Sequence, residues 1–141
     1  MGQTVSVEDR LREIVPRLTT AMHKGQCGRV AIFGGSDLYT GAPYFAGIAA
    51  LRTGVDLVHV FCTESAAGPL KSYSPELIVH PFFQEDYEDP VEACVKRCHA
   101  VVVGPGLGLE EQVQSVMRSV FPSLCALGIP VVVDAVRRPR R

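Results

Sequence analysis

Hydrophobic residues follow two alternating patterns along this chain of 141 residues. Short continuous apolar runs predict buried strands, and stretches with apolar residues at i, i+3, i+4 and i+7 predict amphipathic helices. Five runs predict strands, at residues 29–33, 56–62, 76–80, 100–103 and 129–133. Because these runs are rich in Val, Ile and Leu and alternate with helical segments, they predict an α/β fold: a parallel sheet of about five strands with helices on both faces.

The helical segments precede or separate these strands. They lie at residues 6–18, 43–54, 66–72 and 91–98, and in a stretch that places Val113, Val116, Met117, Val120 and Phe121 on one face. The first has Ser6 as a candidate N-cap with Asp9 three positions on, followed by apolar residues at helical spacing. Pro43 suits the first turn of the second, where a missing N–H costs no hydrogen bond.

Two turns rich in small residues follow predicted strands: GGSDLYTGAPYF at 34–45 and GPGLG at 104–108. In open parallel sheets, ligands collect beyond the carboxyl ends of the strands, because loops there meet helix N-termini whose N–H groups and dipole favour anions. Both turns are therefore candidate ligand loops, and the glycines of the second would allow a ligand close to its backbone. Neither matches the phosphate loop GxxxxGK[ST] or the dinucleotide motif GxGxxG, and a compact turn is the alternative for each. The segment KSYS at 71–74 could line the rim of such a site, although a solvated turn is favoured.

Composition narrows the classes of partner. Hydrophobic residues make up 47% and charged residues 21% of the chain, and the formal net charge of -1 gives no electrostatic reason to bind nucleic acid or an anionic membrane. The apolar stretches are shorter than the ~20 residues of a membrane-spanning helix. We expect the arginine-rich segment at 136–141 to be a solvated tail. No basic or apolar targeting segment is visible, so we expect the cytosol by default, with mitochondria as the alternative.

Other residues that could carry chemistry are weaker candidates. The five cysteines have irregular spacing, and Cys94, Cys98 and His99 have no second ligand cluster in the sequence, so we expect buried thiols and no metal site. His59 lies within an apolar strand, which is typical of a satisfied core residue. Asp134 ends the last predicted strand, and its position fits a ligand contact and a solvated strand end equally well.

Five strings occur in the order HKGQCGRVAIFGG, YTGAPYFAGIAALRTGVDLVHVFC, KSYSPELIVHP, VVVGPGLG and GIPVVVDA. Together, over nearly all of residues 23–135, they resemble the N-terminal half of the ATP-dependent NAD(P)H-hydrate dehydratases. The resemblance implies a ribokinase-like fold. It also implies ATP-dependent dehydration of the S form of hydrated NADH or NADPH (NADHX or NADPHX), by phosphorylation of the hydrate's hydroxyl and then elimination. Mg²⁺ is the implied partner of ATP.

By position, the resemblance implies that six residues contact the dinucleotide substrate: Tyr39, Thr40, Gly41, Ala42, Gly106 and Gly108. All six lie in the two glycine-rich turns. The family pattern continues after GIPVVVDA with a second aspartate and a glycine, where this chain has VRR. The family's ATP-binding segments and its loop with the catalytic aspartate have no counterpart among these residues. The resemblance thus implies an incomplete ribokinase-like domain at 1–135, a basic tail at 136–141 and no identified catalytic residue.

Three other functions stay open at this point. The chain could be a catalytically inactive fragment. It could be a small-molecule kinase of the same fold, which YTGAPYF and KSYSPELIVHP disfavour, or an NAD-dependent dehydrogenase, which the missing GxGxxG disfavours. We expect a small dinucleotide as partner, with neither nucleic acid nor membrane, and a homo-oligomer is compatible with the sequence.

Overall fold

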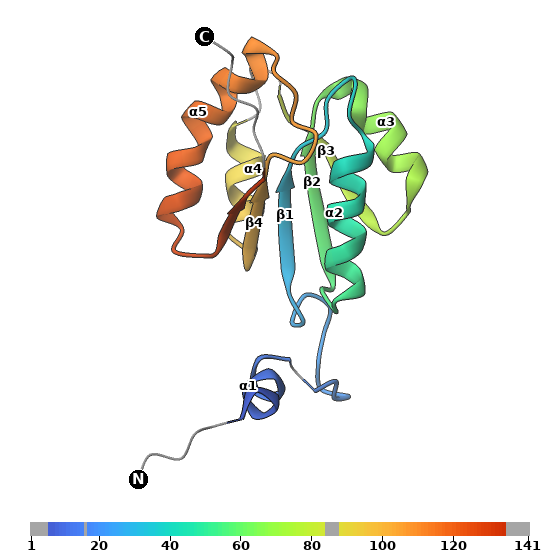
Figure 1. Cartoon of the computed structure of the whole chain (residues 1–141), viewed down its shortest axis with the longest axis vertical. Helices are drawn as coiled ribbons and strands as arrows, with labels where there is room; N and C mark the ends of the chain where they lie inside the picture. The colour runs from blue at the N-terminus through green and yellow to red at the C-terminus, as the bar shows by residue number, and fades with distance from the viewer. Residues whose placement is uncertain (1–5, 16, 84–87, 135–141) are drawn as a thin grey trace.

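The computed structural model describes residues 6–15, 17–83 and 88–134, and Figure 1 shows a sheet between two layers of helices, preceded by a separate helix. The helices are α1 (Val7–Ile14), α2 (Gly41–Arg52), α3 (Glu64–Tyr73), α4 (Glu88–Val95) and α5 (Glu111–Ala126). The strands are β1 (Arg29–Phe33), β2 (Leu57–Cys62), β3 (Leu77–Pro81), β4 (Ala100–Val103) and β5 (Val131–Val133).

β1 lies at the centre of a parallel sheet with the strand order β3-β2-β1-β4-β5. It pairs with β2 as far as Phe33↔Phe61 and with β4 as far as Phe33↔Val103. Because both edges of β1 are hydrogen-bonded and both faces are covered, its last three residues are 0% exposed. The predicted fold class is confirmed.

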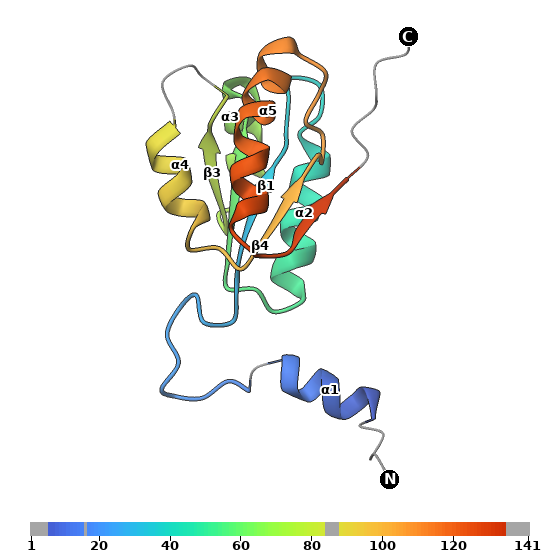
Figure 2. The ribbon, with the colours of Figure 1, turned by 90° about the vertical axis from the view of Figure 1, so that its left-hand side faces the viewer.

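Successive strand residues point to opposite faces, so the sheet has two cores. Figures 1 and 2 show α4 and α5 on one side of the sheet and α2 and α3 on the other. The α4/α5 face is aromatic: Phe33 stacks on Phe61 with ring centroids 4.8 Å apart, and Phe82 meets both edge-on. The opposite face is largely aliphatic, with Ile32 and Leu70 fully buried. Each such large side chain contributes about 1.5–3 kcal/mol by leaving water.

α2 lies unusually close to the sheet because of a glycine in its buried face. A methyl group at Gly47 would lie 2.8 Å from Leu77 Cδ2 and 3.4 Å from Val58 Cγ1. The close approach offsets the cost of a glycine inside a helix, about 1 kcal/mol relative to alanine.

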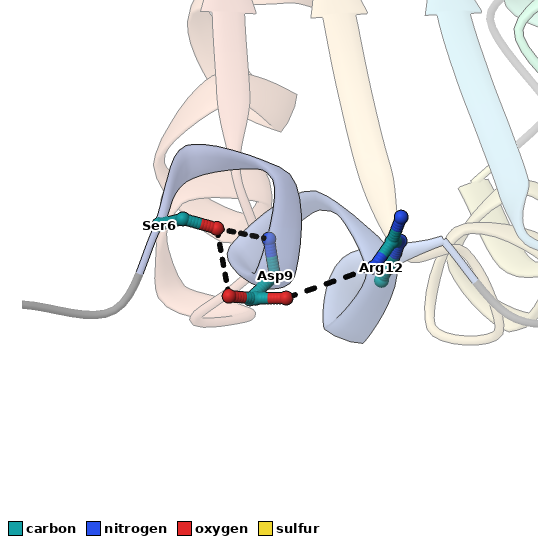
Figure 3. A network of polar contacts seen from close by, with 3 residues as sticks. All are labelled: Ser6, Asp9 and Arg12. Carbon is teal, nitrogen blue, oxygen red and sulfur yellow. Dashed lines mark hydrogen bonds and ion pairs between the residues drawn. The ribbon is translucent and has the colours of Figure 1, made fainter.

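α1 begins where the sequence predicts but ends earlier. The Ser6 hydroxyl accepts a hydrogen bond from the Asp9 N–H (3.1 Å) and donates one to the Asp9 carboxylate (2.7 Å), which also lies 3.8 Å from the Arg12 guanidinium (Figure 3). The helix ends at Ile14 rather than at residue 18, because Val15 precedes a proline and is extended, with ψ of 110°. The periodicity of α1 correctly predicts a helix, but it does not say what covers the apolar face. No residue of α1 is buried in this structure.

Other boundaries differ from the prediction by a few residues. α2 begins at Gly41, which places Pro43 inside its first turn as expected. α4 begins at Glu88, before the predicted start at 91. β5 is three residues long rather than five, since Pro130 precedes it and has no N–H for the ladder. The basic tail at 136–141 lies outside the described residues. Within the described ranges, no helix is long and apolar enough to cross a membrane.

β5 forms an open apolar edge. Among the described residues it pairs with one strand, β4, and Val132 and Val133 are 58% and 57% exposed. Beside it lies a hollow of about 300 Å³ whose lining includes Phe121, Pro122 and Val133. Unpaired N–H and C=O groups on an apolar edge are a template for pairing with another strand.

We therefore expect the 141-residue chain to self-associate through β5, and we expect Val132→Lys to reduce this association by placing a charge on the edge. Val7→Lys is the matched control, because Val7 is 74% exposed on α1, away from the sheet. Light scattering against concentration measures both variants. A wild-type chain that stays monomeric at every concentration would contradict the expectation.

Candidate functional site

The two glycine-rich turns lie side by side at the carboxyl edge of the sheet. This follows from the pairing of β1 with β4, whose ends are in register at Phe33↔Val103. The first turn continues the ladder, because the Gly35 N–H donates to the carbonyl oxygens of Pro105 (3.0 Å) and Gly106 (3.2 Å) in the second. The prediction that both turns lie at the carboxyl edge of a parallel sheet is confirmed.

The glycines of these turns are needed by the fold itself. Gly106 has φ of +61°, and a methyl group there would lie 2.6 Å from the Tyr39 carbonyl oxygen. A methyl group at Gly108, with φ of +79°, would lie 2.9 Å from Ser36 Cβ. The sequence suggested that Gly106 and Gly108 leave room for a ligand. The geometry adds a structural reason for these glycines: they let the second turn pack against the first.

The segment from Tyr39 to Ala42 forms the start of α2 and faces outward. Tyr39 is 57% exposed and Ala42 is exposed, while Thr40 and Gly41 are half-buried. Thr40 occupies the N-cap position, but its side chain makes no capping hydrogen bond. Its hydroxyl instead lies 2.8 Å from the Tyr73 hydroxyl on α3. The first turn of α2 therefore has no side-chain cap, and its positive end favours an anion.

Ser36 is a candidate site residue within the first turn that sequence reasoning did not single out. It is 1% exposed, and its hydroxyl has no hydrogen-bond partner within the described structure. Its backbone forms a tight turn with Tyr39, donating to the Tyr39 carbonyl (3.2 Å) and accepting from the Tyr39 N–H (3.0 Å). The sequence feature that could have pointed to Ser36 is its position directly after Gly34 and Gly35, where a small polar residue enters the junction between the two loops. A buried hydroxyl without a partner is uncommon and calls for an explanation.

Two further candidates from the sequence reach this edge. Tyr73, from the predicted rim segment, joins the site through its bond to Thr40, whereas Ser74 accepts a hydrogen bond from the Glu76 N–H (3.2 Å) and stabilises a local turn. Asp134 is exposed at the end of β5, its N–H donates to the Val103 carbonyl (2.8 Å), and its backbone packs against Gly104. Asp134 therefore stands beside the second loop.

Cys62 packs against Gly35 of the first loop, whereas Cys94 and Cys98 lie in the α4/α5 core. Cys62, Cys94 and Cys98 are buried, and burial raises the pKa of Cys62 to about 12 and that of Cys98 to about 11. These thiols stay protonated at neutral pH and are not nucleophiles. His99 does not join Cys94 and Cys98, because its Nδ1 accepts a hydrogen bond from the Arg29 N–H at 3.0 Å.

Comparison with known proteins assigns the family. The family model for NAD(P)H-hydrate dehydratase matches residues 30–136. The ATP-dependent (S)-NAD(P)H-hydrate dehydratase of Entamoeba histolytica is 53% identical over 136 residues, which are 96% of this chain and 45% of that protein. Its counterpart in Rattus norvegicus is 55% identical over 126 residues, which are 89% of this chain and 37% of that protein. This chain therefore spans less than half the length of these curated relatives.

Solved structures share the fold. A ribokinase-like superfamily protein from Enterococcus faecalis is 26% identical, with a TM-score of 0.68 over 85% of this chain and 45% of that one. The ADP/ATP-dependent NAD(P)H-hydrate dehydratase from Bacillus subtilis, co-crystallized with ATP/Mg²⁺, is 24% identical, with a TM-score of 0.63 over 95% of this chain and 48% of that one. Fold, motif order and the extent of the family match agree: the chain belongs to the NAD(P)H-hydrate dehydratase family.

Proposed function

We propose that the two loops bind the dinucleotide substrate of an ATP-dependent (S)-NAD(P)H-hydrate dehydratase, the activity in the names of the relatives. The observation that carries this proposal is the buried, unpartnered hydroxyl of Ser36 next to the uncapped start of α2. Leaving such a hydroxyl unpaired costs about 1–3 kcal/mol, and a ligand oxygen that accepts from it would remove that cost.

A hydrated nicotinamide dinucleotide suits this edge of the sheet. Its pyrophosphate is an anion, which the first N–H groups and dipole of α2 favour. Tyr39, Thr40, Gly41 and Ala42 would contact the substrate directly, since they form the exposed side of that helix start. Gly106 and Gly108 would hold the second loop against the first, and their contact with the substrate stays a prediction. The relatives' names favour this activity over the small-molecule kinase and dehydrogenase alternatives.

ATP and Mg²⁺ fit the two loops less well. In the part of the chain that the structure describes, the group of three side chains able to hold a metal ion is His59, His80 and Cys94, none of which belongs to either loop. Hard Mg²⁺ takes oxygen ligands, usually carboxylates together with substrate phosphates. We therefore assign the loops to binding and orienting the substrate hydroxyl that ATP phosphorylates. The bound ATP would supply the phosphoryl group that makes this hydroxyl a leaving group.

The remaining expectations belong to the same proposal. Mg²⁺ would accompany ATP, as it does in the name of the B. subtilis structure. A homo-oligomer would form through the open edge of β5. We propose the cytosol as the location, with mitochondria as the alternative.

Ser36→Ala tests whether the unpartnered Ser36 hydroxyl binds the substrate, because the substitution should raise stability and lower affinity. Removing an unpaired buried hydroxyl should raise the free energy of unfolding by about 1 kcal/mol, while binding of the S form of hydrated NADH should weaken because a donor is lost. Denaturant unfolding and calorimetric titration measure the two quantities. Ser119→Ala is the control, because that exposed hydroxyl on α5 donates to the Val116 carbonyl, outside both loops. Unchanged affinity in Ser36→Ala would remove the main support for the proposal.

Gly41→Ala separates substrate contact from folding. A methyl group at Gly41 would have Phe45 Cε2 as its nearest neighbour, at 3.8 Å, so the fold should accept it. It would project where the substrate approaches, and we expect roughly tenfold weaker binding, about 1.4 kcal/mol, with an unchanged melting temperature. Gly106→Ala should instead lower the melting temperature, because of its positive φ and the contact with Tyr39. Equal losses of affinity and stability in Gly41→Ala would mean that the turn is only structural.

An assay of NADHX turnover by the 141-residue chain alone distinguishes a chain that only binds substrate from one that also catalyses the reaction. The chain spans 37% to 45% of the length of the relatives, and its loops lack a Mg²⁺ ligand set in the described structure. We expect no conversion of NADHX to NADH when ATP and Mg²⁺ are added, as followed by absorbance of the reduced nicotinamide. The full-length rat relative serves as the positive control. A rate near that of the relative would show that these residues suffice for catalysis.

A further inference from the structure

Three side chains that ligate metals meet on the α4 side of the sheet. His59 comes from β2, His80 from β3 and Cys94 from α4. One ligand atom from each lies within 4.8 Å of the others. Because the two intervals along the chain are 21 and 14 residues, local spacing could not reveal this group. It is separate from the two loops at the carboxyl edge.

The two imidazoles already stand close to a ligand geometry. His59 Nδ1 lies 3.0 Å from His80 Nε2. With zinc bonds of about 2.0–2.1 Å to nitrogen and about 2.3 Å to sulfur, a tetrahedral ion places two nitrogens ~3.3 Å apart and a nitrogen and a sulfur ~3.6 Å apart. The nitrogens would need to separate by a few tenths of an ångström. From at most 4.8 Å, the sulfur would need to move inward by roughly 1.2 Å at most, which a side-chain rotation can supply.

The sheet holds these rings in place. His80 is in register with Phe61, and their rings stack with centroids 4.8 Å apart and planes 17° apart. His59 lies two residues before Phe61 on β2, so it shares the same face of the sheet, and its ring is inclined by 23° to that of His80. The orientation of both nitrogens is therefore set by backbone pairing and stacking.

Burial lowers the pKa of His59 and of His80, and neutral imidazole is the form that binds a metal ion. Burial raises the pKa of Cys94, so its thiol keeps its proton until a metal displaces it. Arg29, Arg97 and Lys71 are close enough to lower the histidine pKa values further. The thiolate formed on binding would offset their repulsion of a cation.

The site is also reachable from solvent. His59 and His80 are half-buried, and Cys94 is 8% exposed. The neighbouring Cys98 thiol donates to the Cys94 carbonyl at 3.5 Å, which steadies the end of α4. The alternative to a metal site is a simple hydrogen bond between neutral His59 and His80, which explains their 3.0 Å contact. It does not explain why the Cys94 sulfur lies within 4.8 Å of both nitrogens.

We propose that His59, His80 and Cys94 bind a divalent cation of the Zn²⁺ type, with a tetrahedral geometry and water in the fourth position. Imidazole and thiolate donors select zinc over Mg²⁺ or Ca²⁺. The ion would link β2, β3 and α4, and it would stabilise the outer edge of the sheet at β3.

The test is titration of the metal-free 141-residue chain with Co²⁺ alone and then with Zn²⁺. We expect one equivalent of Co²⁺ to bind with a thiolate-to-cobalt charge-transfer absorption, Zn²⁺ to displace it, and Zn²⁺ to raise the melting temperature. Cys94→Ala and His80→Phe should each abolish this absorption and weaken Zn²⁺ binding by at least about tenfold. Loss of a residue that merely hydrogen-bonds to a ligand already costs about tenfold or more, so loss of a ligand itself should cost at least as much. The second variant keeps the aromatic stack on Phe61.

Cys125→Ala and His23→Asn are the matched controls, because both residues are exposed and lie outside the group. They should bind Co²⁺ and Zn²⁺ as the wild type does. X-ray absorption of the Zn²⁺-loaded wild type needs no variant, and it should show nitrogen at about 2.0–2.1 Å and one sulfur at about 2.3 Å. A wild type without charge-transfer absorption, absorption that persists in Cys94→Ala or is lost in Cys125→Ala, or a zinc shell without sulfur would each overturn the proposal.

Discussion

The pairing of β1 between β2 and β4 is the interaction on which the rest of the structure depends. Hydrogen bonding continues past the end of the strand on both sides: the Gly34 N–H donates to the Phe61 carbonyl and the Gly104 N–H to the Phe33 carbonyl, each at 2.9 Å. Both glycine-rich turns thus leave the sheet from the same hydrogen-bonded ladder. Their contact, the exposure of the α2 start and the isolation of the Ser36 hydroxyl all follow from this arrangement.

The site combines tight packing with an unsatisfied polar group. The two turns pack so closely that Gly106 and Gly108 have no room for a side chain, and Ser36 between the turns is 1% exposed. The α2 start beside this junction is the exposed part of the site, with Tyr39 and Ala42 open to solvent. A rigid junction of this kind would suit the proposed binding, because little conformational freedom would be lost on binding.

The two faces of the sheet have different chemistry. The α2/α3 face is mostly aliphatic, and Gly47 allows its helix to lie close to the strands. The α4/α5 face carries the aromatic stack of Phe33, Phe61 and Phe82, and its outer part carries His59 and His80. Rings stacked on rings keep polar nitrogens in fixed positions within an apolar layer. The face that contributes most aromatic burial therefore also brings the metal-ligating side chains together.

Much of this architecture was readable from the sequence. Continuous apolar runs and helical periods identified every strand and helix that the structure describes. The reason is that backbone geometry fixes which residues share one face of a helix or strand, so the pattern of apolar residues follows that geometry. Proline chemistry explains where α1 ends and why β5 is short, although the periodicity alone extended both. The glycine-rich turns and their place at the carboxyl edge were also predicted, since parallel strands send their ends to one side.

Contacts between distant segments were decided by the tertiary structure. Strand order brought Gly106 against Tyr39 and Gly108 against Ser36, which gave those glycines a structural role and left the Ser36 hydroxyl buried without a partner. Register placed His80 beside Phe61, and the packing of α4 brought Cys94 to the two histidines. A one-dimensional pattern records which face a residue occupies but not which residues share that face with it. That neighbourhood depends on pairing and packing, and only the folded chain determines it.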